Sequence, residues 1–124
     1  MDLVDKVCVI TGASSGIGKS LAIKLSLKGA KVVLAARRNS KLEEIRNAIE
    51  REGGNCFGVK TDITKNLECK NLIDETINRY KKIDILILAA GVSMWSPFEE
   101  ISDISFFEDL MATNYTGGVH CVHA

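Results

Sequence analysis

The chain alternates short apolar runs with longer amphipathic segments. Four runs have the β-prone composition of buried strands, and they cover residues 6–11, 31–36, 56–60 and 83–88, the third being the weakest. Between them, apolar side chains recur at the spacing of helices. The predicted helices span residues 16–28, start at Asn39 or Ser40 and end at Gly53-Gly54, start at Asp62 or Thr64, and start near Ser102 or Asp103.

Strands joined by helices of this length predict the α/β fold class, with a parallel sheet, right-handed crossovers and helices on both faces. In such a sheet, ligands bind beyond the carboxyl ends of the strands. A glycine-rich turn follows the first predicted strand there, Arg37-Arg38 the second, Asp62 the third and Gly91 the fourth. We therefore expect these residues to meet at one edge of the sheet.

The turn Thr11-Gly-Ala-Ser-Ser-Gly-Ile-Gly-Lys-Ser20 fits two phosphate-binding patterns. One is the pyrophosphate turn of a nicotinamide dinucleotide, and the other is a relaxed P-loop for ATP or GTP. A P-loop enzyme needs a glycine where this chain has Ala13, and an aspartate after an apolar strand to help hold magnesium. The fourth strand ends in Ala-Ala-Gly instead, which disfavours the P-loop and makes Lys19-Ser20 incidental.

The dinucleotide hypothesis gives each glycine a task. Gly12 permits a tight exit from the strand, Gly16 lets the backbone approach a pyrophosphate, and Gly18 allows close packing of helix on sheet. Ser14 and Ser15 lie between them. A glycine turn without a ligand remains the structural alternative.

The end of the second strand indicates which dinucleotide binds. NAD sites usually carry an acid about 20 residues past the glycine turn, to bind the ribose hydroxyl. Here the sequence is Ala35-Ala-Arg-Arg38, and a guanidinium pairs well with a phosphate. We expect NADP (NADPH) as the cofactor, although a merely solvated arginine pair is the alternative, above all for Arg38.

Composition bears on nucleic-acid binding, metal binding and cellular location. Sixteen basic and sixteen acidic residues cancel among the 124 residues, which gives no electrostatic basis for nucleic-acid binding. Four dispersed cysteines without zinc spacing, and two histidines without nearby ligands, predict buried thiols and no metal site. With no signal peptide visible, we expect a cytoplasmic protein; an anchor outside these residues stays open.

These motifs together resemble those of the short-chain dehydrogenases/reductases, over essentially the whole chain. The resemblance rests on residues 11–18, on Asp62-Ile-Thr, on Leu88-Ala-Ala-Gly91 and on Asn114-Tyr-Thr-Gly117. It implies a Rossmann-type doubly wound sheet, here truncated after about four strands. Residues 1–124 would then be an NAD(P)-binding domain that is incomplete at its C-terminus.

The resemblance also implies roles for single residues. Gly12, Ser14, Gly16, Ile17 and Gly18 would wrap the pyrophosphate, Arg37 would bind the 2′-phosphate, Asp62 the adenine amino group with Ile63 beside the ring, and Ala90 and Gly91 would pass under the ribose. One position departs from the family, because Ala89 replaces an asparagine that normally supports the sheet and the ribose.

Asn114 resembles the family's catalytic asparagine, whose backbone carbonyl holds a water that links the active-site lysine to solvent. From the residues alone, Asn114 ahead of Gly117-Gly118 indicates a local irregularity in a helix, and a structural role remains open. The catalytic serine and the Tyr-x-x-x-Lys pair are not found in the 124 residues, so the chain alone is expected to be inactive.

The resulting hypothesis is the N-terminal, cofactor-binding part of an NADP-dependent oxidoreductase. It would transfer hydride between nicotinamide and a small carbonyl or alcohol substrate, lipophilic if the similarity to hydroxysteroid dehydrogenase-like members holds. The full-length protein is expected to be a homo-oligomer. A non-catalytic NADP-binding or interaction module is the alternative function, with the P-loop NTPase a remote one.

Overall fold

In a computed structural model, which describes residues 2–14, 16–91 and 105–124, the elements alternate as the pattern predicts. The described elements are β1 (Val7–Thr11), α1 (Gly16–Leu27), β2 (Lys31–Ala36), α2 (Asn39–Arg51), β3 (Asn55–Lys60), α3 (Asn66–Tyr80), β4 (Ile85–Leu88), α4 (Ser105–Met111), a π-helix (Ala112–Thr116) and α5 (Gly117–His123). The predicted helix start at Ser102 or Asp103 lies outside the described residues.

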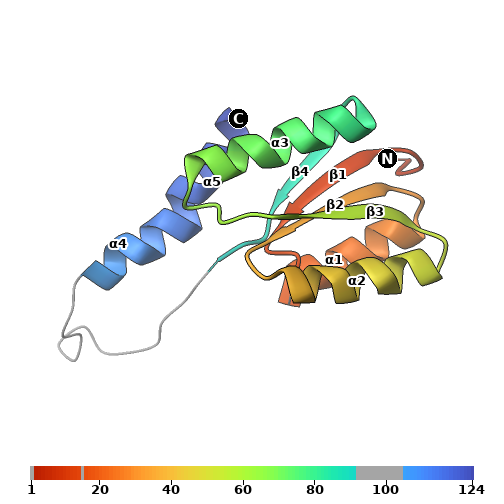
Figure 1. The fold of residues 1–124 in the computed structure, drawn as a ribbon, viewed down its shortest axis with the longest axis horizontal. Coiled ribbons are helices and arrows are strands. Elements are labelled where there is room, and N and C mark those ends of the chain that lie inside the picture. Colours follow the sequence, from red (N-terminus) through yellow and green to blue (C-terminus); the bar gives the residue numbers. More distant parts are fainter. Residues whose placement is uncertain (1, 15, 92–104) are drawn as a thin grey trace.

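The four strands form one parallel sheet in the order β3-β2-β1-β4. Helices α1 and α2 cover one face, and α3 and α5 lie on the other (Figure 1). Alternate strand residues point to opposite faces, so Ile10 and Leu34 pack on the α1–α2 side, whereas Val9 and Val33 pack with Leu72 of α3. The expected doubly wound Rossmann-type fold is confirmed.

One predicted helix cap and one predicted helix start are wrong. Helix α2 begins at Asn39, but neither Asn39 nor Ser40 is its cap, because Arg38 in extended conformation occupies the cap position and makes no side-chain cap bond. Helix α3 begins at Asn66 rather than at Asp62 or Thr64. The Asp62 carboxylate instead accepts hydrogen bonds from the backbone N–H (3.0 Å) and hydroxyl (2.6 Å) of Thr64. The Asp62 side chain therefore stabilises the turn that precedes α3 and does not cap the helix.

The fourth strand is shorter than predicted because Asp84 sits at its entrance. The Asp84 carboxylate accepts a hydrogen bond from the Val7 N–H at 2.8 Å, while the Asp84 N–H donates to the Val7 carbonyl at 2.9 Å. Ladder pairing with β1 then starts one residue later, at Ile85 with Cys8. This exchange fixes β4 against β1 and sets where both strands end.

Candidate nucleotide-binding site

The turn after β1 has a backbone that only glycine suits at its first position. Gly12 has a φ of +64°, and a Cβ there would stand 2.6 Å from the Ala90 backbone nitrogen. Any larger residue would therefore strain the turn and push away the end of β4. Gly12 lets the two strand ends approach each other.

The rest of the turn leaves room above the start of α1. A Cβ on Gly18 would overlap the Gly12 carbonyl oxygen, so this glycine lets the helix pack on its own turn. At Gly16, where φ is +58°, a Cβ would meet nothing within 4 Å. Gly16 is also the first residue of α1, whose unpaired N–H groups and dipole favour an anion. The turn thus combines an open approach with an electropositive helix end.

A cleft of about 430 Å³ lies over this turn at the carboxyl edge of the sheet. Its volume falls in the usual range of small-molecule sites, roughly 300–1,000 Å³. It is lined by Gly12, Ser14, Gly16, Ile17, Ala35, Ala36, Arg37, Arg38, Thr61, Asp62, Ile63, Ala89, Ala90, Gly91 and Thr113.

Most residues predicted for the cofactor site line this cleft. Gly18 does not line it because it is buried behind the turn, and Ser15 lies outside the described residues. Asn114, predicted as a catalytic residue, lines an adjacent hollow. The prediction missed five lining residues, which are Ala35, Ala36, Thr61, Ala89 and Thr113. The first four stand at strand ends, where position in the pattern alone would have found them.

Arg37 and Arg38 follow β2 with exposed side chains at the rim of the cleft. The Arg37 charge lies near enough to Asp62 to help lower the pKa of that carboxyl, although the Thr64 hydrogen bond contributes most. The cleft therefore has two guanidinium groups where an NAD site usually carries an acid.

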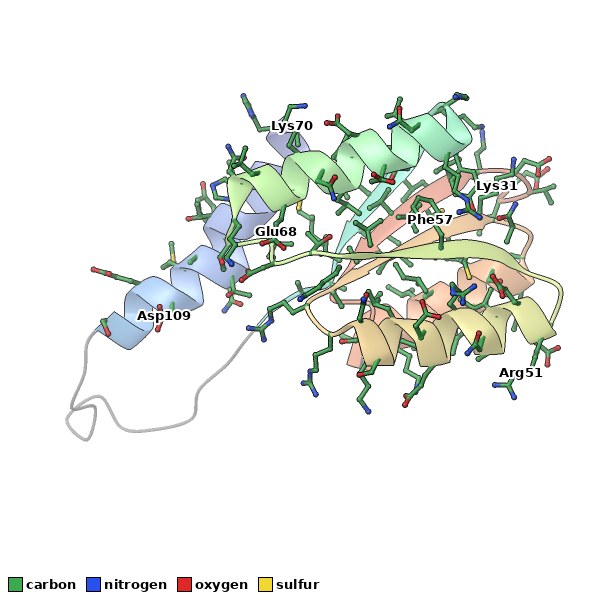
Figure 2. All side chains as sticks on the ribbon, viewed as in Figure 1. Lys31, Arg51, Phe57, Glu68, Lys70 and Asp109 are labelled. Carbon is green, nitrogen blue, oxygen red and sulfur yellow. The ribbon has the colours of Figure 1, made fainter. Side chains whose placement is uncertain are left out.

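The Asp62 turn is held from both sides. Its N–H donates to the Glu68 carboxylate at 3.0 Å, and Figure 2 shows Glu68 reaching back from the first turn of α3 toward this loop. The Thr64 hydroxyl and N–H hold the Asp62 carboxylate and keep its pKa below the usual range. An ionised, fixed carboxylate at the cleft is suited to accept hydrogen bonds from an amino group.

Thr11 links the ends of β1 and β4 next to the unusual Ala89. Its buried hydroxyl accepts a hydrogen bond from the Ala90 N–H at 3.4 Å and donates to the Ile87 carbonyl at 3.5 Å. Ala89 itself packs against the core cluster on the α1–α2 side. The strand end therefore has polar support from Thr11 although position 89 has an apolar side chain.

Asn114 lies in the π-helix between α4 and α5, so the irregularity predicted there is present. Its side-chain oxygen is 3.3 Å from where a Cβ on Gly91 would stand, which places the amide beside the β4 end of the cleft. Asn114 also lines an apolar hollow of about 510 Å³, and Ile63, Ala90 and Thr113 line both this hollow and the cleft. π-Helical turns occur frequently at functional sites.

The described residues give no support to a P-loop, a metal site or a membrane-spanning helix. Lys19 and Ser20 are exposed on α1 and do not line the cleft. Among residues 2–14, 16–91 and 105–124, three or more His, Cys, Asp or Glu side chains are nowhere grouped to hold a metal. In the same ranges, the helices are too short or too polar to cross a membrane.

The chain is similar in sequence to known dehydrogenases and oxidoreductases. The family model for short chain dehydrogenase matches residues 6–124. An uncharacterised oxidoreductase of Listeria monocytogenes is 42% identical over 124 residues, which are all of this chain and 50% of that protein. The 11-beta-hydroxysteroid dehydrogenase A of Sesamum indicum is 40% identical over 120 residues, which are 96% of this chain and 34% of that protein. The chain spans half or less of these relatives' lengths.

Solved structures of short chain dehydrogenases have the same fold. A short chain dehydrogenase/reductase from Burkholderia phymatum, solved in complex with NAD, superposes with a TM-score of 0.93 at 29% identity, covering 99% of this chain and 43% of that one. Neither comparison favours a P-loop NTPase. With a family model that matches nearly every residue, the chain belongs to the short-chain dehydrogenase/reductase family.

Proposed function

We propose that the chain is the cofactor-binding part of an NADP-dependent oxidoreductase that acts on a carbonyl or alcohol substrate. When bound, the nicotinamide dinucleotide would supply hydride transfer. The observation that carries the proposal is the meeting of the open Gly16 approach, the α1 N-terminus and the Arg37-Arg38 pair in one cleft.

The cleft's own residues support a division of tasks. We assign Gly12, Ser14, Gly16 and Ile17 to the pyrophosphate, with Gly18 shaping the turn, and Arg37 with Arg38 to the 2′-phosphate. Asp62 and Ile63 would hold the adenine, and Ala90 and Gly91 the ribose. We also assign Ser15, which the sequence places between the glycines of the turn, to cofactor binding. Asn114, next to Gly91, is assigned to the catalytic end.

Substrate and context are proposed more broadly. Because plant relatives are named 11-beta-hydroxysteroid dehydrogenases, we propose a lipophilic small-molecule substrate for the full-length protein. We also propose that this protein is a homo-oligomer. All four cysteines are buried and unbridged, which suits a reducing compartment, and we propose a cytoplasmic location.

The NADP preference is tested by titrating NADP and NAD against the full-length protein. We expect tighter binding of NADP, and an Arg37→Ala variant that loses roughly tenfold or more in NADP affinity but little in NAD affinity, because a charge-assisted bond to phosphate contributes about 1.5–3 kcal/mol. Arg51→Ala removes an equally charged, exposed residue on α2 outside the cleft lining and serves as the matched control.

Two results would count against the proposal. Equal affinity for both cofactors in the unmodified protein would refute the NADP preference. NADP binding without turnover of any carbonyl or alcohol substrate in the full-length protein would instead favour the non-catalytic binding module.

A further inference from the structure

Two cysteine thiols from different helices touch beside the cleft. The Sγ atoms of Cys69 in α3 and Cys121 in α5 are 3.6 Å apart, and the residues are 0% and 1% exposed. The tasks assigned above use neither thiol. Their sequence separation is 52 positions, so the contact exists only because α3 and α5 pack together on the same face of the sheet.

The same spot joins both helices to the adenine side of the cleft through Ile63. The Cys69 thiol donates to the Ile63 carbonyl at 3.4 Å, and His120 Nδ1 of α5 lies 3.3 Å from that oxygen. A carbonyl only accepts, so this His120 nitrogen carries the proton. The Ile63 side chain meanwhile packs under Gly117, where a Cβ would stand 2.7 Å from it. Ile63, Cys69 and Cys121 form one buried cluster.

We propose that Cys69 and Cys121 close into a reversible disulfide that ties α3 to α5 and weakens dinucleotide binding at the adjoining cleft. The effect on binding rests on the function proposed above, whereas the formation of the bond does not. Cysteine pairs that oxidise in reducing compartments are usually transient and redox-sensing.

Hydrogen peroxide is the oxidant for this reaction. One thiolate attacks a peroxide oxygen and breaks the O–O bond, which gives a sulfenic acid and, after protonation of the leaving hydroxide, one water. The second sulfur then attacks the sulfenic sulfur, the S–S bond forms, and hydroxide leaves as a second water with the remaining thiol proton. Two electrons pass from the sulfurs to the peroxide, and a dithiol reductant reverses the change.

Bond formation demands only a short movement. The sulfurs are 3.6 Å apart and a disulfide needs about 2.05 Å, so the two sulfurs must approach each other by about 1.5 Å, through side-chain rotation and a shift of α5 toward α3. Oxidation also removes the Cys69 proton that the Ile63 carbonyl accepts. The loop that carries Asp62 and Ile63 therefore loses a hydrogen bond while α5 presses closer on Ile63, and we expect the adenine side to bind less tightly.

The environment makes the reaction slow rather than impossible. Burial raises the pKa of Cys121 to about 12 and also raises the pKa of Cys69. Because the thiolate is the reactive form, we expect oxidation over minutes to hours, which suits sustained rather than brief oxidation.

The experiment treats the full-length native protein with hydrogen peroxide, blocks remaining thiols in denaturant and maps tryptic peptides by mass. Each of the four cysteines falls on its own tryptic peptide: residues 7–19, 52–60, 66–70 and one that begins at Ile83. NADP affinity is then measured for the reduced, oxidised and re-reduced protein. Cys121→Ala removes one partner. Cys56→Ala, which replaces a buried cysteine of the core cluster on the α1–α2 side, is the matched control.

We expect a link between peptide 66–70 and the peptide that begins at Ile83, together with a roughly fivefold loss of NADP affinity, equal to one neutral hydrogen bond. Dithiothreitol should restore both, Cys121→Ala should show neither, and Cys56→Ala should show both. No such link in the unmodified protein overturns the proposal, as does a link that leaves NADP affinity unchanged. Reduced protein that binds no NADP refutes the proposed function instead, while the peptide map still decides whether the bond forms.

Discussion

The hydroxyl of Thr11 accepts a hydrogen bond from the backbone N–H of Ala90 at 3.4 Å. This contact ties the end of β1 to the end of β4 under the cleft, next to Ala89. Thr11 is completely buried and Ala90 is half-buried, so loss of the hydroxyl would leave the Ala90 N–H without this partner.

Thr11→Val should therefore destabilise the protein by about 0.5–1.5 kcal/mol, the net contribution of a typical hydrogen bond. NADP affinity should fall as well, because Ala90 and Gly91 line the cleft. Urea unfolding and cofactor titration measure the two effects. Thr11→Ser keeps the hydroxyl and should retain most of both; if serine behaved like valine, the hydrogen bond would not be the cause.

Substitutions at Gly12 and Gly16 should separate folding from binding. At Gly12 an alanine Cβ would collide with the Ala90 backbone at 2.6 Å, and we expect a loss of about 3 kcal/mol or more in stability. At Gly16 the same Cβ meets nothing, so the positive φ alone costs about 1–2 kcal/mol.

Gly16→Ala should nevertheless bind NADP much more weakly, because its methyl group occupies the space assigned to the pyrophosphate. Thermal unfolding together with isothermal titration distinguishes the two variants. A Gly16→Ala protein with unchanged NADP affinity would contradict the assignment of this turn to the cofactor.

Asp84 should make stability depend on acid pH. Its hydrogen bond from the Val7 N–H, and then its pairing with Lys82, lower the pKa of the carboxyl below its ordinary value of 3.8. A group with a depressed folded-state pKa contributes stability above its unfolded pKa and loses it as the pH falls through the folded pKa.

Asp84→Asn should thus be less stable than the unmodified protein near neutral pH, and the difference should shrink below about pH 4. Urea midpoints measured from neutral to acid pH would check this. A difference that stays constant over the whole range would show that the charge of Asp84 is not responsible. Asp74→Asn, which removes an exposed i,i+4 pair with Lys70 on α3, is the control.

Asn114→Ala distinguishes the two roles left open for this residue. We expect turnover of the full-length enzyme to fall at least about tenfold, because the side-chain amide beside Gly91 would no longer help position the Asn114 backbone carbonyl. Stability should change by less than about 1 kcal/mol because alanine suits a helix. Thr116→Ala, at an exposed position of the same π-helix, should retain activity. A large loss of stability with unchanged turnover per folded molecule would favour the structural role.

The sequence pattern predicted the sheet well because buried strands carry a strong apolar signal. Residues 31–36 were predicted and observed with the same bounds, and Arg37 appears at the ligand edge as expected. Helix starts were harder, since Asp62 has the side chain of a good cap but uses it for Thr64. Glu68 also accepts a hydrogen bond from the Asp62 N–H. The pattern of apolar and polar residues does not indicate this contact or the path of the loop.

Contacts between segments far apart in the sequence could not be predicted from the pattern of apolar and polar residues either. Nothing in the spacing of Cys69 and Cys121 indicates that their sulfurs meet, because the packing of α5 on α3 sets that distance. The sequence indicated an irregularity near Asn114, but a π-helix needs the hydrogen-bond geometry of the folded chain to be recognised.

The π-helix determines which way the side chains of α5 point. A π-turn holds one residue more than an α-turn, and in an α-helix that residue would rotate everything downstream by about 100°. The segment Ala112–Thr116 therefore sets the direction in which the following side chains point, including Gly117 against Ile63 and Cys121 against Cys69. A continuous α-helix through the same residues would turn Gly117 and Cys121 away from these partners, whereas deleting one residue so that the α-helix is restored would keep them facing Ile63 and α3.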